Sequence, residues 1–261
     1  MQRNNLVLFW EQVRGIPIIQ EAIQQNEGSC ALAAISTHIG YNLRISYVWD
    51  VRIPVNIPAG ILVDHLKWEE EIKKLVGEPV KNLTVLFEDA KVNGVPLWNG
   101  MRLKIDNSYR IMPLNEGALR TELWKYTVLA VLRIHEDYSE HGEMPYMGRK
   151  GIMKDKYGNM ETHTVVLVGE YRDNSLFAEN EATEALWIYQ NSDGIRELSF
   201  LDNGLNVVKN SLVLEAYCIE IYASNPLLEQ EAVNMLQRTG LRQEARAVPE
   251  VLLLNRELQN L

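Results

Sequence analysis

The second half of the chain consists of short apolar runs separated by polar turns. The runs are rich in valine, isoleucine, leucine and tyrosine, which favour a pleated and half-buried backbone. Because each run is bounded by turn-forming residues, we expect an antiparallel sheet or barrel. The polar, acidic residues 172–184 lie between two of the runs and predict a long hairpin loop. The predicted strands are residues 110–113, 127–134, 164–169, 185–190 and 213–222.

The first half of the chain has a helical pattern instead. A polar approach that contains glycine leads to a run of good helix formers beginning at Cys30, and Gly40 supplies a stop signal. We therefore expect a helix from Cys30 to about Ile39. The other predicted segments are an extended lead-in over residues 1–23, loop or short strand over 41–59, and helices over 61–75 and 83–92.

The change of pattern near residue 110 predicts an α+β fold with two subdomains and an appended tail. In the tail, Asn225-Pro226 is typical of a helix start and Gly240 of a helix end. The predicted parts are a helical subdomain at residues 1–110, a β-rich subdomain at 111–224 and a C-terminal helical extension at 225–261.

Charge and cysteine content narrow the range of functions. The 261 residues carry a net charge of -9 without any cluster of lysine and arginine, which argues against nucleic acid and membrane surfaces as partners. No set of side chains has metal-ligand spacing and no phosphate-binding loop is present, so we expect neither metal nor organic cofactor. The two cysteines and the lack of a secretory signal or a long apolar run predict a cytoplasmic location. The oligomeric state stays open.

Cys30 is the first candidate for chemistry. A thiol in the first turn of a helix lies near unpartnered backbone N–H groups and the positive end of the helix dipole, which favour the thiolate. The alternative is a small buried cysteine in a core helix, which is the ordinary role of an intracellular cysteine. Partners elsewhere in the chain decide between the two interpretations.

A nucleophilic thiolate needs a base that holds its proton as imidazolium. His38 lies eight residues along the same helix, roughly 12 Å from Cys30 by the rise per residue, so it cannot pair with Cys30. We expect His65 to be solvated on a charged helix, and His135 and His141 to lie on the surface of an acidic loop. His163 differs from these because it opens the apolar run 164–169, where a strand can hold the ring rigidly.

Two further residues complete a possible acyl-transfer site. The run 185–190 ends at Asn191, which a hairpin places beside His163, and an amide there orients the imidazole without overstabilising its cation. The tetrahedral intermediate needs hydrogen-bond donors for its oxyanion. Gln24, on the approach to Cys30, supplies one, and the Cys30 backbone N–H supplies another.

Three sequence blocks resemble those of papain-like cysteine peptidases, in the order of that family. They run from Gln24 to Cys30, from residue 162 to 169 around His163, and from residue 187 to 194 around Asn191. His163 follows Cys30 by 133 residues (163 − 30), and a related cysteine signature has its histidine about 130–150 residues downstream. The resemblance implies a helical subdomain facing an antiparallel β-barrel-like subdomain, with the active-site cleft between them. It also implies a peptide or protein substrate, Cys30 as nucleophile, His163 as base and acid, Asn191 as orienter and Gln24 in the oxyanion hole.

Several positions depart from the family pattern. An aromatic residue commonly follows the nucleophile, where this chain has Ala31, and a shielding tryptophan commonly stands at the position of Asp193. Glu27 replaces a cysteine, Cys218 lacks its usual partner and is expected to be a free buried thiol, and no inhibitory prodomain is expected. Two functions therefore compete: an active cysteine peptidase, and a catalytically weak or inactive peptidase-fold protein that binds peptides or proteins. In a third interpretation, Cys30, His163 and Asn191 are unconnected core residues.

Overall fold

A computed structural model describes much of the chain. The chain divides into two compact units, residues 1–222 and 223–261. All described residues belong to the first unit, so the predicted C-terminal extension at 225–261 lies outside them, as do residues 173–183 of the predicted hairpin loop. The described residues are 6–10, 12–13, 16–19, 22–23, 25–26, 28–46, 59–77, 82–140, 145–172, 184–192 and 204–221.

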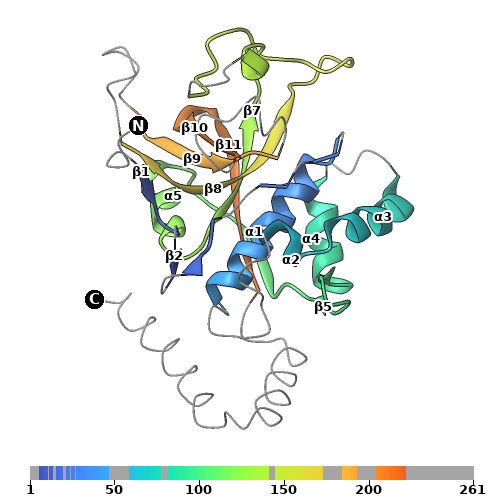
Figure 1. Ribbon diagram of the computed structural model, residues 1–261. Helices are drawn as coiled ribbons and strands as arrows, with labels where there is room; N and C mark the ends of the chain where they lie inside the picture. Colours follow the sequence, from blue (N-terminus) through green and yellow to red (C-terminus); the bar gives the residue numbers. More distant parts are fainter. Residues whose placement is uncertain are drawn as a thin grey trace. The chain divides into compact units, whose positions relative to one another are not determined.

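A seven-stranded antiparallel sheet dominates the described part of the chain (Figure 1). Its strand order is β10-β9-β8-β7-β11-β6, and β1 pairs with the far half of β8. The predicted antiparallel sheet is therefore confirmed. The strands are β1 (Leu6–Leu8), β6 (Asn107–Arg110), β7 (Val128–Arg133), β8 (Thr162–Tyr171), β9 (Leu186–Gln190), β10 (Leu205–Lys209) and β11 (Val213–Glu220).

One predicted strand of the large sheet is misplaced, and β10 of that sheet is not predicted. The prediction over residues 110–113 is wrong, because β6 ends at Arg110 and its polar residues Asn107 and Ser108 pair with β11. An edge strand does not need an apolar pattern, and Pro113 has no N–H to donate to a ladder. β10 has no counterpart among the predicted strands, since it is short and buries a polar residue, Asn206, in its middle.

The longest described helix, α1 (Cys30–Ser46), passes Gly40 without interruption, so the predicted end near Ile39 is wrong. A glycine inside a helix costs about 1 kcal/mol relative to alanine. Tertiary burial outweighs this cost, because α1 is buried from Cys30 to Arg44. The helix contacts β7 and β8 on one side and α2 (Ala59–Leu62) and α3 (His65–Val76) on the other (Figure 1).

The predicted helix over residues 61–75 is divided in two. Val63 leaves the helical path to form a bridge with Leu97, and the Asp64 side chain then accepts a hydrogen bond from the Lys67 N–H at 3.2 Å. An aspartate in this position caps a new helix, which here is α3. Helix α4 (Leu83–Val92) has the predicted bounds, whereas α5 (Glu116–Leu123) has no counterpart among the predicted helices.

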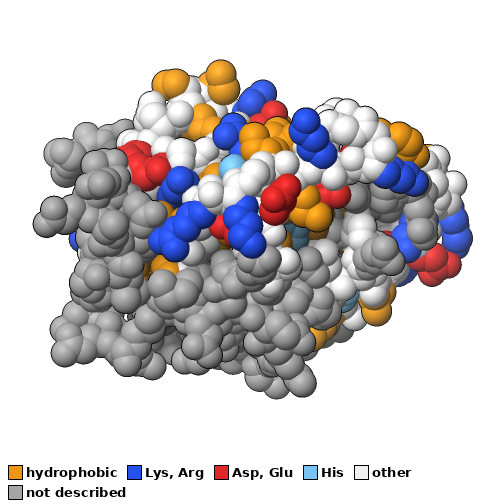
Figure 2. All heavy atoms as spheres, turned by 90° about the horizontal axis from the view of Figure 1, so that it is seen from above, with side chains coloured by type: hydrophobic (Ala, Val, Ile, Leu, Met, Phe, Trp, Pro, Cys, Tyr) orange, Lys and Arg blue, Asp and Glu red, His pale blue; other side chains and the backbone are white. Residues whose placement is uncertain are grey.

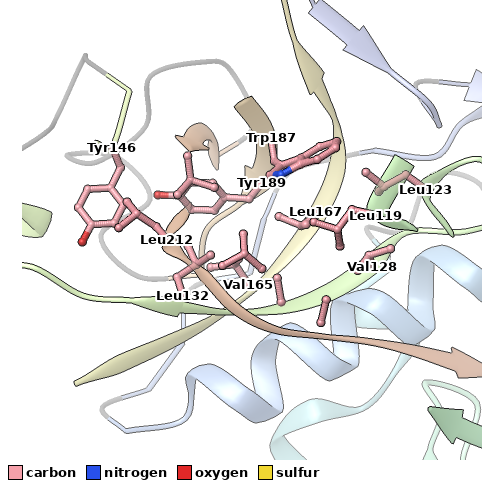
Figure 3. Packing of buried hydrophobic residues seen from close by; sticks show 14 of the residues in the cluster. Leu119, Leu123, Val128, Leu132, Tyr146, Val165, Leu167, Trp187, Tyr189 and Leu212 are labelled. Atoms are coloured by element: carbon pink, nitrogen blue, oxygen red, sulfur yellow. The ribbon is translucent and has the colours of Figure 1, made fainter. Parts of the chain in front are cut away.

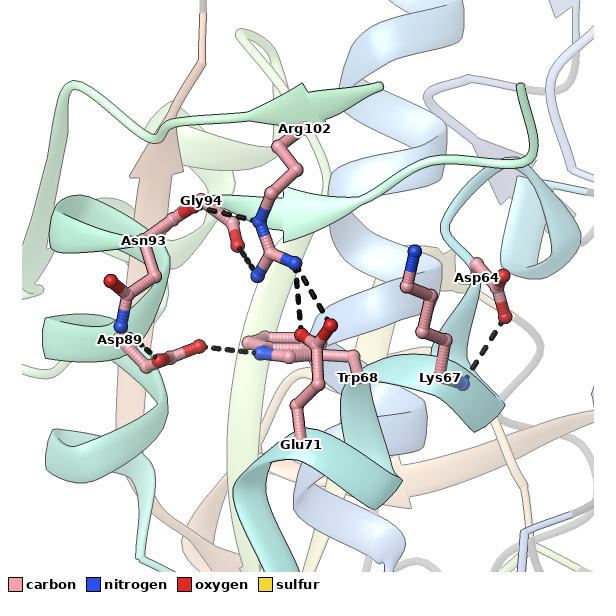
Figure 4. A network of polar contacts seen from close by, with 8 residues as sticks. All are labelled: Asp64, Lys67, Trp68, Glu71, Asp89, Asn93, Gly94 and Arg102. Atoms are coloured by element: carbon pink, nitrogen blue, oxygen red, sulfur yellow. Dashed lines mark hydrogen bonds and ion pairs between the residues drawn. The ribbon is translucent and has the colours of Figure 1, made fainter. Parts of the chain in front are cut away.

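A polar network joins α3, α4 and a small hairpin of β4 (Val95–Pro96) and β5 (Arg102–Leu103) (Figure 4). The Arg102 guanidinium donates to the backbone carbonyls of Asn93 and Gly94 at 2.8 and 2.6 Å, and to the Glu71 carboxylate at 2.9 Å. Planar guanidinium groups suit such multiple acceptors. The network fixes α3, which carries a residue of the candidate site.

One cluster of the hydrophobic core lies on the face of the sheet that α5 and the connection between β7 and β8 cover (Figure 3). Trp187 and Tyr189 of β9 lie at its centre, and both are 0% exposed. The Trp187 indole N–H keeps a polar partner, the Asn210 side-chain oxygen, at 3.0 Å. Aromatic side chains of this size supply much of the buried apolar area of a domain.

The described residues of the connection between β7 and β8 form local structure beside the sheet. They include a 3-10 turn at Tyr138–Glu140 and the buried Tyr146. Antiparallel bridges pair His135 with Ile152 and Lys154 with Met160. Hydrophobic and basic side chains lie close together on the face seen from above (Figure 2). The exposed hydrophobic and basic residues of this connection include Arg149, Lys150, Ile152, Met153, Lys154, Lys156, Tyr157 and Met160.

Candidate active site

Cys30 is the first residue of α1, and its side chain is buried at 8% exposure. The Ala33 N–H donates to the Ser29 carbonyl at 3.0 Å, so Ser29 closes the first helical turn around the cysteine. The first turn of α1 contains no acidic residue. The positive end of the helix dipole is therefore not neutralised from within the helix, which favours a thiolate at this position.

A buried carboxylate fixes the segment that leads to Cys30. Glu69 of α3, 3% exposed, accepts hydrogen bonds from the Ser29 hydroxyl at 2.5 Å and the Asn26 side-chain amide at 2.9 Å, and it pairs with Lys73 at 3.0 Å. Burial alone would raise the pKa of Glu69, but these hydrogen bonds and the Lys73 charge hold it below its ordinary value. Glu69 was not predicted as a site residue, since a run of three glutamates on a charged helix is typical of a solvated surface.

His163 and Asn191 are in direct contact at the ends of neighbouring strands. His163 lies near the start of β8 and Asn191 directly follows β9, and His163 Nε2 is 2.9 Å from Asn191 Oδ1. Both side chains are buried, at 6% and 1% exposure. An amide oxygen only accepts hydrogen bonds, so His163 Nε2 carries the proton in this contact. His163 Nδ1 is then the basic nitrogen when the ring is neutral.

Tyr138 also contacts this pair. Its hydroxyl donates to Asn191 Oδ1 at 3.3 Å, and its ring lies 5.5 Å from the His163 ring, centroid to centroid, with a tilt of 53°. Tyr138 is 7% exposed. The sequence contains no local signal for this contact, because Tyr138 lies in an acidic, polar loop.

The approach to Cys30 and the segment after β9 are hydrogen-bonded to each other. The Gln25 N–H donates to the Ser192 carbonyl at 2.7 Å, and the Ser192 hydroxyl donates to Gln25 Oε1 at 2.8 Å. Ala34 and Thr37 of α1 line a small pocket together with Asn191. The helix that begins at Cys30 and the strand end that carries Asn191 are therefore neighbours.

Two predicted features of the site lie outside the described residues. These are the oxyanion-hole residue Gln24 and the departure at Asp193. Within the described ranges, no group of three or more histidine, cysteine, aspartate or glutamate side chains could hold a metal ion.

The other histidines have different environments. His38 is 0% exposed: its Nδ1 lies 2.8 Å from the Thr127 hydroxyl, and its Nε2 accepts from the Ile219 N–H at 3.3 Å. It therefore has a structural role in the core. The expectation of a surface position for His135 is wrong, because its ring is buried and its Nδ1 lies 2.7 Å from the Lys150 carbonyl. His141 lies outside the described residues.

Neither Cys30 nor Cys218 forms a disulfide, as predicted for Cys218. Cys218 is buried on β11, and its sulfur contacts the Glu122 carboxylate at 3.7 Å. Burial, reinforced by the nearby negative charge, raises the pKa of this thiol to about 12. Cys218 is therefore an unreactive thiol at neutral pH.

Solved structures with a similar fold include cysteine proteases. The bromelain protease of Ananas comosus, in complex with the E64 inhibitor, aligns with a TM-score of 0.59 and 14% identity, over 84% of this chain and 99% of its own. Procathepsin B of Trypanosoma congolense aligns with a TM-score of 0.56 and 12% identity over 85% and 79% of the two chains. Xylellain, a cysteine protease of Xylella fastidiosa, aligns with a TM-score of 0.55 and 13% identity, over 84% of this chain and 87% of its own.

The protein therefore has the α+β fold of the papain-like cysteine proteases, as the sequence blocks predict. At this level of identity the comparison supports a cysteine peptidase by fold alone. No protein-family model and no curated protein sequence matches the chain. Among the described residues, none of the helices combines the length and the apolar character needed to cross a membrane.

Proposed function

We propose that the protein is a cysteine peptidase that hydrolyses peptide bonds of peptides or proteins. Cys30 is its nucleophile, His163 its general base and acid, and Asn191 the residue that orients His163. The observation that carries the proposal is the buried 2.9 Å contact between His163 Nε2 and Asn191 Oδ1. The helix N-terminus at Cys30 and the Gln25–Ser192 hydrogen bonds support it, because they bring the helix start close to Asn191.

The proposed reaction follows from the proton positions. With the Nε2 proton engaged by Asn191, His163 Nδ1 takes the proton of the Cys30 thiol, and the thiolate attacks the substrate carbonyl carbon. Gln24 and the Cys30 backbone N–H are the proposed donors to the oxyanion. The imidazolium then returns its proton to the leaving amine as the C–N bond breaks. Water activated by His163 hydrolyses the resulting thioester and releases Cys30.

We further propose that the substrate lies between the helical residues 1–110 and the β-rich residues 111–224. In the described part of the chain, α1 carries Cys30 while β8 and the end of β9 carry the other two residues. The two cysteines, which form no disulfide, support the proposal of a reducing, cytoplasmic setting.

The competing function is peptide or protein binding with little turnover. It is favoured by the sequence departures beside the site, with alanine after the nucleophile and aspartate at position 193. This alternative keeps the fold but not the reactive thiolate.

Alkylation kinetics with iodoacetamide between pH 4 and 10, read by mass spectrometry, test the proposal. We expect Cys30 to react well below pH 8, whereas an ordinary cysteine becomes reactive near its pKa of about 8.5. Cys218 is the internal control, because burial makes it slow across the neutral range. In His163→Ala, the labelling of Cys30 at low pH should disappear.

Cleavage assays with a peptide library separate the two functions. Fast labelling of Cys30 together with cleavage supports the peptidase. Labelling of Cys30 that rises only near pH 8.5 and is unchanged in His163→Ala would overturn it and favour the binding protein.

A further inference from the structure

The contact between His163 and Asn191 is buried although the sequence predicts a solvent-admitting neighbour at position 193. The Asn191 side chain is 1% exposed and the His163 ring 6% exposed. Tyr138, from the connection between β7 and β8, packs directly against both residues. This tyrosine comes from a segment of the chain remote from either strand end.

We propose that Tyr138 is a positioning residue, which fixes the proton arrangement of the His163–Asn191 pair and excludes water from it. The proposal deepens the proposed peptidase function and takes its catalytic meaning from that function. The tautomer of the His163 ring and the exchange rate of its N–H proton can be measured whether or not the protein cleaves peptides.

The Tyr138 hydroxyl defines which end of the Asn191 amide faces His163. The oxygen and nitrogen ends of a carboxamide have nearly the same shape, so the surrounding donors and acceptors must select one orientation. Tyr138 donates to Oδ1 at 3.3 Å and His163 donates to the same oxygen at 2.9 Å. An amide flipped by 180° would present N–H groups instead, so the Tyr138 hydroxyl would have to turn and accept and His163 would have to carry its proton on Nδ1. The donation from Tyr138 to Oδ1 therefore adds a hydrogen bond to the orientation in which His163 carries its proton on Nε2 and keeps Nδ1 for Cys30.

The Tyr138 ring provides the shield. The centroids of the Tyr138 and His163 rings lie 5.5 Å apart with the ring planes tilted by 53°, so the two rings are in close contact. His163 becomes a cation when it takes the thiol proton, and burial opposes that charge, whereas the hydrogen bond to Asn191 Oδ1 favours it. The ring can thus exclude water from the hydrogen bond without preventing formation of the imidazolium.

The position of Tyr138 is itself fixed by packing. Its ring meets Tyr146 edge to face at 5.0 Å, and its N–H donates to the His135 carbonyl at 2.9 Å. The Tyr146 hydroxyl in turn donates to the Arg133 carbonyl at 3.1 Å and accepts from the His135 N–H at 2.7 Å. These contacts connect the loop to the end of β7, the strand that pairs with β8 next to His163. Tyr138 is therefore held independently of the His163–Asn191 pair and can fix the position of that pair.

Proton and nitrogen NMR of the His163 ring in 15N-histidine-labelled protein tests the proposal. Comparison with His163→Gln assigns the signals. In a Cys30→Ala background at alkaline pH, where the ring is neutral and no thiol proton reaches it, we expect a single tautomer with a slowly exchanging Nε2 proton. Tyr138→Leu should expose this proton to fast exchange and populate the second tautomer. Tyr138→Phe keeps the ring but lacks the hydroxyl, so exchange should stay slow while the tautomer preference weakens.

The rate of Cys30 alkylation below pH 8 provides the second measurement. Removing one hydrogen bond should lower it about five- to tenfold in Tyr138→Phe, with a larger loss in Tyr138→Leu. Tyr157→Leu is the matched control, since Tyr157 is 76% exposed in the same connection and should change neither measurement.

Unchanged tautomer, exchange rate and alkylation profile in folded Tyr138→Leu would overturn the positioning role. If that variant does not fold, Tyr138→Phe decides, and a wild-type tautomer preference in it would overturn the role of the hydroxyl. A failure of the peptidase proposal has a different result: the labelling of Cys30 by iodoacetamide would be the same in the wild type and in His163→Ala.

Discussion

The buried carboxylate of Glu69 gives the sharpest test of how the nucleophile segment is held. The change Glu69→Gln keeps the size of the side chain but removes its charge. One glutamine oxygen replaces the two carboxylate oxygens that accept from Ser29 and Asn26, so the Ser29 hydroxyl would have to turn and accept from the glutamine NH2 group. The hydrogen bonds to a charged acceptor next to Cys30 are therefore lost.

The expected loss of stability follows from these contacts. A hydrogen bond to a charged group contributes about 1.5–3 kcal/mol. The Lys73 pair adds about 0.5 kcal/mol at most, because the lysine side chain is 35% exposed. We expect Glu69→Gln to lower the free energy of unfolding by about 2–3 kcal/mol. In a domain of this size, that loss corresponds to a fall in Tm of about 4–12 °C.

The pH dependence of this loss has a definite sign. The folded-state pKa of Glu69 lies below its ordinary value of 4.5, so the unfolded chain binds the proton more readily. The stabilisation by the carboxylate is then fully present above pH 4.5 and is lost as the pH falls through the folded-state pKa. The difference in Tm between wild type and Glu69→Gln should shrink over this acidic range.

Thermal and urea unfolding of the two proteins at pH 7 and under acidic conditions provide the measurement. Glu70→Gln is the matched control, because Glu70 lies next in the sequence but is exposed and pairs with the exposed Lys74. It should unfold close to the wild type. Equal stability of Glu69→Gln and Glu70→Gln at pH 7 would refute the assignment of Glu69 as the anchor of the approach to Cys30.

Two further predictions concern stability away from the site. Burial lowers the pKa of His38 to about 3, so the unfolded chain binds a proton between pH 6.5 and pH 3 that the folded protein does not. Relative to His38→Gln, the free energy of unfolding of the wild type should therefore fall by about 1.4 kcal/mol per pH unit over this range, measured by urea unfolding. Equal pH dependence of the two proteins would contradict this. Gly94→Ala should destabilise more than Gly100→Ala in the same assay. Both glycines have positive φ, which costs a side chain about 1–2 kcal/mol, but only at Gly94 would the added Cβ meet a backbone atom, the Leu103 carbonyl oxygen, at 2.9 Å.

The elements that the sequence predicts well are those whose signals are local. Helix α4 has its predicted bounds because Asn82 caps one end, where its side chain accepts from two backbone N–H groups, and Asn93-Gly94 ends the other. The long helix α1 is misjudged at Gly40 for the opposite reason. The glycine signal is local and weak, whereas the burial that continues the helix comes from tertiary contacts with α2, α3, β7 and β8.

The candidate site divides in a similar way. Cys30, His163 and Asn191 are predictable because the order and spacing of their sequence blocks follow the order of the elements that carry them. Glu69 and Tyr138 leave no such trace. Each lies in a charged segment whose composition predicts a solvent-exposed side chain. Each reaches the candidate site only through tertiary packing, which buries Glu69 against Ser29 and Tyr138 against Asn191.

Glu69 and Tyr138 also bear on the sequence departures that weaken the case for activity. The family resemblance would place a cysteine at Glu27 and a tryptophan at Asp193, one near the approach to the nucleophile and the other beside the histidine. In this chain a carboxylate from α3 holds the approach, and a tyrosine from the β7–β8 connection covers the histidine. Loss of the family's residues at these positions is therefore weak evidence against catalysis, because both physical tasks have candidates elsewhere in the fold. The reactivity of Cys30 in Glu69→Gln and Tyr138→Phe, measured against wild type, decides whether these candidates perform them.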